Sequence, residues 1–363
     1  MPDQVRHDDF RTFYEIIKSG DIKYAFRKDD PVRYKLLSLL LVILVYASVF
    51  PLYALAQQEE RKPVPGASVE KGGALLPTGR FVLEPAFQYA HNSSKQLVSI
   101  SGFSIFNAIL IGRIDLKEIE RDIYIPSITA RLGFKDMELN VKVPWMYRRD
   151  KETNPATDPP TVYSADDSGL GDIEGGFYYK LVSERGAIPD IILSLGVKSD
   201  TGRDPYGLQT ETVGGQLRYK EFPTGTGHWG YSGGLIFVKT TDPAVVFLNL
   251  TYFYNDSRDI GTEGGTFYGE VDPGDSFEYN IGTVVALNEK FSLNFTLNQR
   301  ITGKTVQNGS EIADSDLNAI SLNLGGTYAI SKWFSIDVTA GIGLTSDAND
   351  VTLMIRVPIN FEF

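Results

Sequence analysis

Alternation of apolar and polar residues dominates the chain from about residue 80 to its end. The last thirteen residues, Val351–Phe363, place an apolar side chain at every second position. A two-residue period is that of a β-strand with one apolar and one polar face. The segments that begin at Met137, Phe291 and Phe334 show the same pattern. Because their polar faces hold small and charged residues, we expect those faces to line water or a polar interior.

The links between the predicted strands alternate between short and long. Five short turns are expected, at 135–136, 183–189, 241–243, 289–290 and 331–332. Six longer polar loops are expected, at 92–120, 150–168, 200–228, 255–275, 302–317 and 345–350. Five turns and six loops are the connections that twelve up-and-down strands need. A barrel of fourteen strands is the alternative left open. Short turns at one rim and long loops at the other are typical of bacterial outer-membrane barrels. We therefore predict an all-β, membrane-spanning, antiparallel up-and-down β-barrel over residues 80–363.

Aromatic residues are expected at both rims of such a barrel, where rings meet the lipid headgroups. Near the long-loop rim the topology places Trp145, Tyr147, Trp229, Tyr231, Tyr252, Tyr254 and Tyr279. Near the short-turn rim it places Phe134, Phe291, Tyr328, Trp333, Phe334, Phe361 and Phe363. The terminal Phe363 resembles the end of the closing strand of an outer-membrane barrel, which the assembly machinery reads. Outer-membrane lipid and that machinery are therefore expected partners.

The first 79 residues have a different character. Arg33 and Lys35 precede an apolar run at 36–50, and the small residues Ala54 and Ala56 follow it. This order indicates an N-terminal extension and secretory signal peptide over residues 1–56, cleaved after Ala56, with an uncleaved inner-membrane anchor as the alternative. Residues 57–79, rich in proline and glycine, are predicted to form a flexible periplasmic lead-in or a plug. The expected location is the outer membrane of a Gram-negative bacterium.

Composition excludes several other classes of protein. Apolar residues make up 42% of the chain without a series of long runs. A bundle of membrane helices is excluded, since each span needs roughly 20 apolar residues. The chain has no cysteine, so a disulfide framework or a cysteine metal site is impossible. The net charge of −11 argues against nucleic acid as a partner.

Charged residues on the polar strand faces are the candidates for the interior of the barrel. Nine are predicted to face the lumen: Arg131, Glu138, Lys142, Glu174, Lys180, Glu278, Arg300, Asp337 and Arg356. Their mixed signs argue against strong ion selection, which needs a ring of one sign. Twelve strands leave room for a narrow pore, unless the lead-in or a loop folds into it. The alternative is that the charges only hold the strands together across the lumen.

Catalytic chemistry finds little support in the sequence. His91 and His228 are predicted at loop-side ends of strands. A histidine base needs a serine or carboxylate within hydrogen-bond reach, and residues 166, 167 and 204 are the carboxylates left open for His228. A histidine at the barrel rim is the favoured interpretation. We therefore predict no catalytic, cofactor or metal site and a protein that is not an enzyme.

Two glycine-rich segments resemble a known family. Residues 169–181, GLGDIEGGFYYKL, resemble the GLGD-type strand opening of the family named for the MetA pathway of phenol degradation. Residues 223–247 resemble its central signature, and the resemblance spans roughly Arg80 to Phe363. It implies an outer-membrane channel or transporter and makes small, aromatic or hydrophobic molecules the expected solutes. It implies no binding residues, since we know of no established site motif in the family.

Four functional hypotheses follow from the sequence. The first is a monomeric outer-membrane channel or transporter for small, aromatic or hydrophobic solutes. The second is a structural or export-accessory barrel without solute flux. The third is an outer-membrane hydrolase that uses His228. The fourth is a soluble periplasmic β-sandwich.

Overall fold

The computed structural model describes residues 75–93, 118–154, 161–213, 216–241 and 243–362. The chain divides into two units, Met1–Glu60 and Arg61–Phe363, and every described residue belongs to the second. The predicted signal peptide, the cleavage site after Ala56, most of the lead-in and Phe363 lie outside the described residues. No helix in the described ranges is long and apolar enough to cross a membrane.

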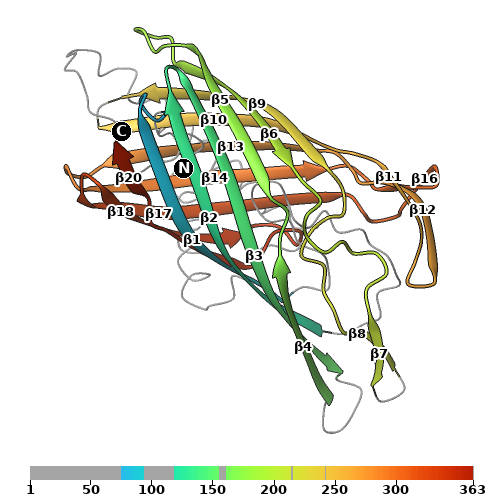
Figure 1. Cartoon of the computed structure of the whole chain (residues 1–363). Helices are drawn as coiled ribbons and strands as arrows, with labels where there is room; N and C mark the ends of the chain where they lie inside the picture. Colours follow the sequence, from blue (N-terminus) through green and yellow to red (C-terminus); the bar gives the residue numbers. More distant parts are fainter. Residues whose placement is uncertain (1–74, 94–117, 155–160, 214–215, 242, 363) are drawn as a thin grey trace, which may run out of the picture. The chain divides into compact units, whose positions relative to one another are not determined.

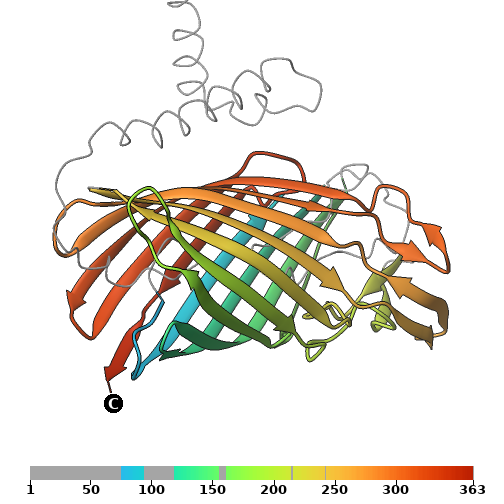
Figure 2. The same cartoon turned by 90° about the horizontal axis from the view of Figure 1, so that it is seen from above.

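The second unit is a closed antiparallel β-barrel (Figures 1 and 2). The last two strands, β19 and β20, both pair with β1. This pairing closes the barrel and brings the red end of the chain beside the blue first strand in Figure 2. The wall consists of β1 (Arg80–Asn92), β2 (Glu118–Phe134), β3 (Met137–Asn154), β4 (Thr161–Leu170), β5 (Glu174–Val182), β6 (Asp190–Lys198), β9 (Gly230–Thr240), β10 (Ala244–Asn255), β13 (Ser276–Ala286), β14 (Phe291–Thr302), β17 (Leu317–Ser331), β18 (Phe334–Gly343), β19 (Val351–Arg356) and β20 (Ile359–Glu362).

These fourteen hydrogen-bonded strands make twelve positions around the barrel. β4 and β5 follow one another along β3, and β19 and β20 follow one another along β1. Val357 and Pro358 separate β19 from β20, because proline has no N–H to give to a ladder. The predicted twelve-stranded up-and-down barrel is confirmed, and the soluble sandwich is wrong.

The predicted short turns lie where expected, but four of the predicted loops contain further strands. β3 and β4 extend into the expected loop at 150–168, and β7 (Thr210–Val213) pairs with β8 (Gln216–Tyr219). A separate sheet contains β11 (Arg258–Glu263), β12 (Thr266–Asp272), β15 (Val306–Gln307) and β16 (Ser310–Glu311). The short strands satisfy their backbone groups by pairing with one another, and their apolar contacts are confined to a small cluster of Tyr206, Ile260, Tyr268 and Val271. Their sequences therefore lack the alternation that identified the wall.

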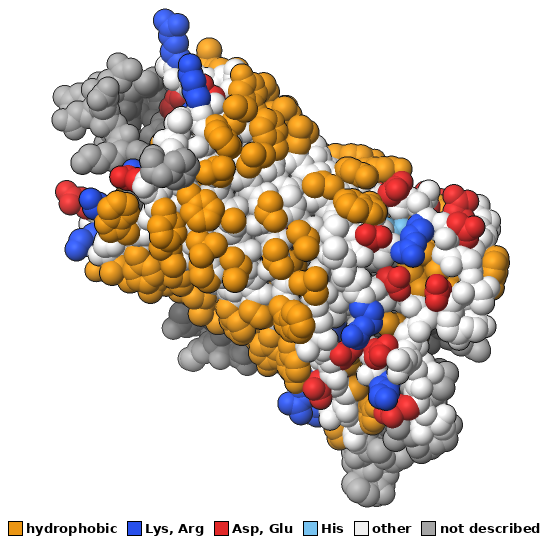
Figure 3. Space-filling model, viewed as in Figure 1, with side chains coloured by type: hydrophobic (Ala, Val, Ile, Leu, Met, Phe, Trp, Pro, Cys, Tyr) orange, Lys and Arg blue, Asp and Glu red, His pale blue; other side chains and the backbone are white. Residues whose placement is uncertain are grey.

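The outer face of the wall is apolar and exposed. On β3, Leu139, Val141, Val143 and Trp145 are 40–50% exposed, whereas Glu138 on the opposite face is buried. Figure 3 shows such side chains as a broad orange area over the wall, while charged side chains gather mainly toward its ends. So large an exposed apolar area on a closed barrel is suited to solvation by lipid tails.

Exposed aromatic rings lie near both rims, as the sequence predicts. Toward the long loops these include Trp145, Trp229, Tyr231, Tyr252 and Tyr254, and toward the short turns Phe134, Tyr328, Trp333 and Phe361. Tyr231 and Tyr254 stack across neighbouring strands with ring centroids 6.4 Å apart. Their positions match the headgroup level of a spanning barrel.

Candidate functional site

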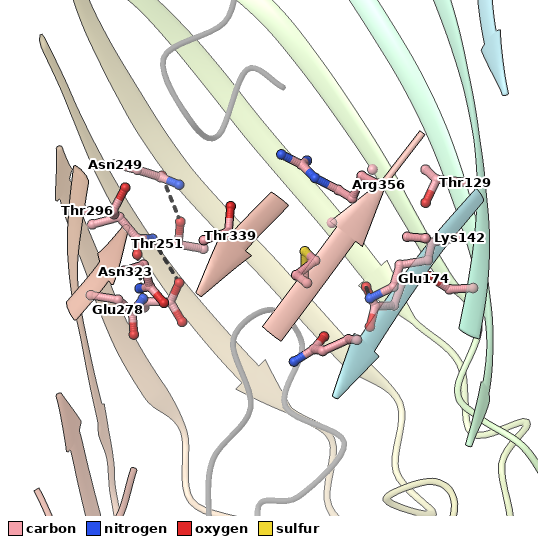
Figure 4. A pocket seen from close by; sticks show the side chains of 18 of the residues that line it. Thr129, Lys142, Glu174, Asn249, Thr251, Glu278, Thr296, Asn323, Thr339 and Arg356 are labelled. Carbon is pink, nitrogen blue, oxygen red and sulfur yellow. Dashed lines mark hydrogen bonds and ion pairs between the residues drawn. The ribbon is translucent and has the colours of Figure 1, made fainter. Parts of the chain in front are cut away.

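The barrel encloses a cavity of about 340 Å³ lined by the inward faces of its strands. Figure 4 shows two differing walls of this lumen. Asn249, Thr296 and Asn323 lie on one side, and Lys142 and Arg356 lie on the other. The period of two turns every second side chain of each strand toward this space.

A buried ionic network joins five strands at the short-turn half of the lumen. Arg131 Nε donates to Glu138 Oε1 at 2.7 Å, and Arg131 also lies 3.9 Å from Glu84. Glu84 lies 3.7 Å from Arg356, which pairs with Asp337 at 2.9 Å. The network therefore links β1, β2, β3, β18 and β19 through alternating charges.

Two further ion pairs lie on other parts of the inner wall. Glu278 on β13 contacts Arg300 on β14 at 2.6 Å, and the Arg300 guanidinium lies 4.2 Å from the centroid of the Phe253 ring. Lys142 on β3 contacts Glu174 on β5 at 3.4 Å. The Lys142 side chain is 31% exposed, far more than the arginines of the network.

Most of the nine predicted lumen residues are brought together by the fold. Asp337 is buried beside Arg356. Lys180 instead lies near the short-turn mouth, 3.7 Å from Asp190 and beside a smaller pocket of about 230 Å³. Among the nine, those that line the main cavity are Arg131, Glu138, Lys142, Glu174, Glu278, Arg300 and Arg356. Their part in solute passage stays a prediction.

Sequence reasoning did not single out Glu84 or the asparagines of the lumen. Glu84 is in phase with Val82 and Gln88 on the inward face of the first strand, a signal that was available. The asparagines alternate with outward apolar residues on β10, β13 and β14. Because they are uncharged, they did not stand out from ordinary polar positions.

Asp172 and Lys198 anchor a long loop into the wall between β4 and β5. Both side chains are fully buried, and Lys198 Nζ lies 3.1 Å from Asp172 Oδ2. Lys198 Nζ also donates to the His228 carbonyl at 2.6 Å, and Asp172 accepts from the Thr226 N–H at 2.9 Å. A Cβ at Gly225 would collide with Asp172 Oδ1, so only glycine allows this approach. The ion pair therefore holds residues 199–229 against the barrel.

The end of the lead-in enters the short-turn mouth of the lumen. Leu75 is buried in an apolar cluster with Tyr178, Ile192, Ile236, Val238, Phe247 and Val284 of β5, β6, β9, β10 and β13. The Leu76 N–H donates to Glu138 Oε2 at 3.0 Å. A Cβ at Gly133 would collide with the Pro77 carbonyl oxygen, so glycine permits this close packing.

His228 is held as a packing residue of the anchored loop. Its Nε2 lies 2.6 Å from the Tyr206 hydroxyl, and its Nδ1 lies 2.8 Å from the Asp256 carbonyl oxygen. Neither ring nitrogen contacts a serine or a carboxylate among the described residues. Asp167 and Asp204 pair instead with Arg203 and Arg258, respectively. His228 is therefore poorly placed to act as a general base.

His91 lies on the outward face near the long-loop rim. Its Nδ1 lies 2.8 Å from Asp122 Oδ1, which also accepts from the Tyr89 hydroxyl at 2.7 Å. Tyr89 packs on Tyr124 with ring centroids 5.2 Å apart. His91 therefore lies among polar side chains beside the aromatic rings of the long-loop rim.

The burial of His228 predicts that the loop weakens in acid. Burial, together with the charge of Lys198, lowers the pKa of His228 to about 4. An unfolded histidine has a pKa of about 6.5, so the unfolded loop takes up the proton first as pH falls. The stability contributed by neutral His228 is therefore present above pH ~6.5 and lost between there and about 4.

Hydrogen exchange of residues 204–228 from pH 8 to pH 4 measures this loss. The exchange rates, corrected for the intrinsic effect of pH, are expected to rise as pH falls through this interval. His228→Gln keeps a hydrogen-bonding side chain without that titration and is the matched control. An equally steep rise in the His228→Gln variant would assign the acid response to other groups.

Several solved structures are similar to this chain. An outer membrane channel from Pseudomonas putida F1 matches with a TM-score of 0.57 and 14% identity, covering 83% of this chain and all of that one. The translocator domain of the autotransporter NalP from Neisseria meningitidis gives a TM-score of 0.43 at 10% identity, covering 79% and 90%. The P. putida toluene transporter TodX gives 0.38 at 11% identity, covering 78% and 89%.

The first of these likenesses shows the outer-membrane barrel fold. A family model described as "Putative MetA-pathway of phenol degradation" matches residues 105–360, more than half of the chain. That range includes both glycine-rich segments, at 169–181 and 223–247, that resemble the family. The chain therefore belongs to the Putative MetA-pathway of phenol degradation family.

Proposed function

We propose that this barrel is an outer-membrane channel through which small solutes pass by diffusion. The observation that carries the proposal is a polar-lined cavity inside a closed wall whose outer face is apolar. The likeness to the P. putida outer membrane channel and the transporter role that the family resemblance implies support the same function. Lipid solvates the outside, and water with solute occupies the inside.

We further propose that aromatic or hydrophobic solutes are among those that pass. Ile125, Tyr178 and Phe253 interrupt the polar lining of the cavity and offer apolar contact. The family description, which names phenol degradation, supports this choice. Paired charges of both signs support weak discrimination between anions and cations.

Uptake into proteoliposomes tests the channel. Purified barrel in lipid vesicles should admit small solutes faster than protein-free vesicles do. The barrel fold of the preparation is checked by heat-dependent migration on a gel. A correctly folded barrel that admits none of a size series of solutes would remove the transport function. If a protein partner is also captured by cross-linking, that outcome would favour a structural or export-accessory barrel. The lead-in at the mouth of the lumen supports this alternative.

We propose that residues 57–79 restrict the periplasmic mouth, because Leu75 and Leu76 fasten the end of this segment inside it. Deleting residues 57–76 is expected to increase solute uptake and conductance severalfold. The measurement is single-channel conductance of the purified variants. Deleting residues 57–70 leaves Leu75 and its contacts in place and is the matched control. Equal conductance of all three proteins would contradict the restriction.

The remaining assignments are also proposals. They are a bacterial outer-membrane location, a monomer, removal of residues 1–56 after Ala56, and recognition of Phe363 by the assembly machinery. N-terminal sequencing of the mature protein from membranes tests the cleavage site. Removal of Phe363 should slow insertion of the barrel without changing its final fold.

A further inference from the structure

One wall of the lumen carries asparagines in adjacent positions on three strands. Asn249 on β10 is the cross-strand partner of Asn280 on β13, which is the partner of Asn298 on β14. Asn298 Nδ2 donates to Asn280 Oδ1, and Asn280 Nδ2 donates to Glu278 Oε1 at 2.9 Å. The three amides therefore form one lateral row, in which Asn280 and Asn298 are joined directly, while the side-chain carbonyl oxygen of Asn249 accepts from the Thr251 hydroxyl at 3.2 Å.

Two more asparagines extend this wall over neighbouring glycines. Asn294 on β14 faces Gly325 on β17, and Asn323 on β17 faces Gly341 on β18. A Cβ at Gly325 would lie 2.7 Å from the Asn294 amide, and one at Gly341 would collide with the Asn323 amide. Glycine at both positions gives each amide room to lie across the next strand. We call the asparagines at 249, 280, 294, 298 and 323 the asparagine wall.

The charges of the lumen are largely withdrawn from this space. The side chains of Arg131 and Glu138 are 7% and 1% exposed, and those of Arg300 and Glu278 are 3% and 6% exposed. Asn249, Asn294 and Asn298 are packed as closely, at 5–7% exposed, so the amides of the asparagine wall that a solute can reach are those of Asn280 and Asn323. The partly exposed residues of the cavity lining are mostly amides and hydroxyls, and on this side they include Thr296 and Ser321. In Figure 4, Asn249, Thr296 and Asn323 gather opposite Lys142 and Arg356.

Amides and hydroxyls are chemically matched to each other. An asparagine side chain offers two N–H donors and a carbonyl acceptor, and a hydroxyl both donates and accepts. The contacts among the described residues use one N–H and one carbonyl lone pair of Asn280. A charged solute entering this narrow space would lose hydration and would meet partly exposed charges mainly at the Lys142–Glu174 pair. An uncharged solute can exchange its bonds to water for bonds to the wall.

We propose that the asparagine wall binds the hydroxyl groups of small uncharged solutes, which makes such molecules the preferred substrate class. This inference rests on the proposed channel function and adds the solute chemistry to it. Hydroxyl-bearing rings fit both this wall and the apolar contacts of Phe253, while charged acids of the same size are disfavoured.

Binding of xylitol to the detergent-solubilised barrel, followed by saturation-transfer NMR, tests the proposal without requiring flux. Xylonate has the same carbon chain with a carboxylate and is the charged comparison. The double variant Asn280→Leu with Asn298→Leu keeps the number and branching of the side-chain heavy atoms but removes two amides. Thr129→Val removes a polar group on the opposite side of the cavity and is the control variant.

Wild type and Thr129→Val should bind xylitol alike and more tightly than xylonate. The asparagine double variant should need about fivefold more xylitol or higher for half-saturation, as expected for one or two lost hydrogen bonds. If the double variant does not fold, as judged by heat-dependent gel migration, Asn323→Leu takes its place. Equal binding of xylitol and xylonate, or unchanged binding in the folded asparagine variant, would overturn the proposal. Xylitol binding without solute flux would contradict the channel function and leave the binding wall intact.

Discussion

Replacing Arg131 with methionine is expected to lower the free energy of unfolding of the barrel by about 3–5 kcal/mol. Arg131 contacts Glu138 at 2.7 Å and Glu84 at 3.9 Å, and all three side chains are at most 8% exposed. Methionine fills most of the space but leaves two buried carboxylates without this cation. The Leu76 N–H bond to Glu138 and the ion pair of Glu84 with Arg356 compensate only in part.

Urea unfolding in detergent or lipid, with the folded fraction read from gel migration, measures this loss. Arg80→Met is the matched control, because Arg80 pairs with Glu362 where the side chains are 39% and 52% exposed. Its loss should be only ~0–1 kcal/mol, as for other exposed ion pairs. Similar stability of the Arg131→Met variant and wild type would show that the ionic network does not hold the wall together.

Replacing Lys198 with methionine is expected to release the loop at 199–229, with a local loss of about 3–5 kcal/mol. Lys198 and Asp172 are 1% and 0% exposed, so the variant leaves a fully buried carboxylate without its cation. The bond from Lys198 Nζ to the His228 carbonyl is lost as well. The effect should remain near this loop, because the backbone pairing of β3 with β4 and with β5 does not depend on Lys198.

Hydrogen exchange and limited proteolysis of residues 199–229 measure the release. Lys239→Met is the control, since Lys239 pairs with Glu184 at partly exposed positions, 31% and 25%, near the short turns. Adding Asp172→Leu to Lys198→Met should restore part of the protection, because it removes the unpaired charge. Wild-type protection of the loop in the single Lys198→Met variant would contradict its anchoring role.

The wall of the barrel is predictable from sequence because lipid and lumen impose opposite demands on adjacent residues. Leu139 and Val141 face outward, and Glu138 and Lys142 face inward, as their alternation indicates. The same argument locates β14 and β18, whose alternating faces are equally plain. Turn positions follow where the alternation stops.

Other features depend on contacts between distant segments, which alternation does not encode. The ion pair of Lys198 with Asp172 joins residues from β6 and from the gap between β4 and β5. Asn249 and Asn280 become neighbours only through the register of β10 with β13. The hairpins beyond the barrel bury only a few apolar side chains, such as Tyr268 and Val271, so their sequences resemble those of loops. Lys180 has the right phase for the lumen but lies too near the short turns to line the main cavity.

Single-channel recording of the purified barrel in planar bilayers tests most directly whether the polar lumen is an open path across the membrane. Insertion should produce discrete current steps, with a reversal potential near zero in a KCl gradient because the lumen charges are paired. A heat-modifiable, membrane-inserted barrel that carries no current and admits no small solute would contradict the channel function.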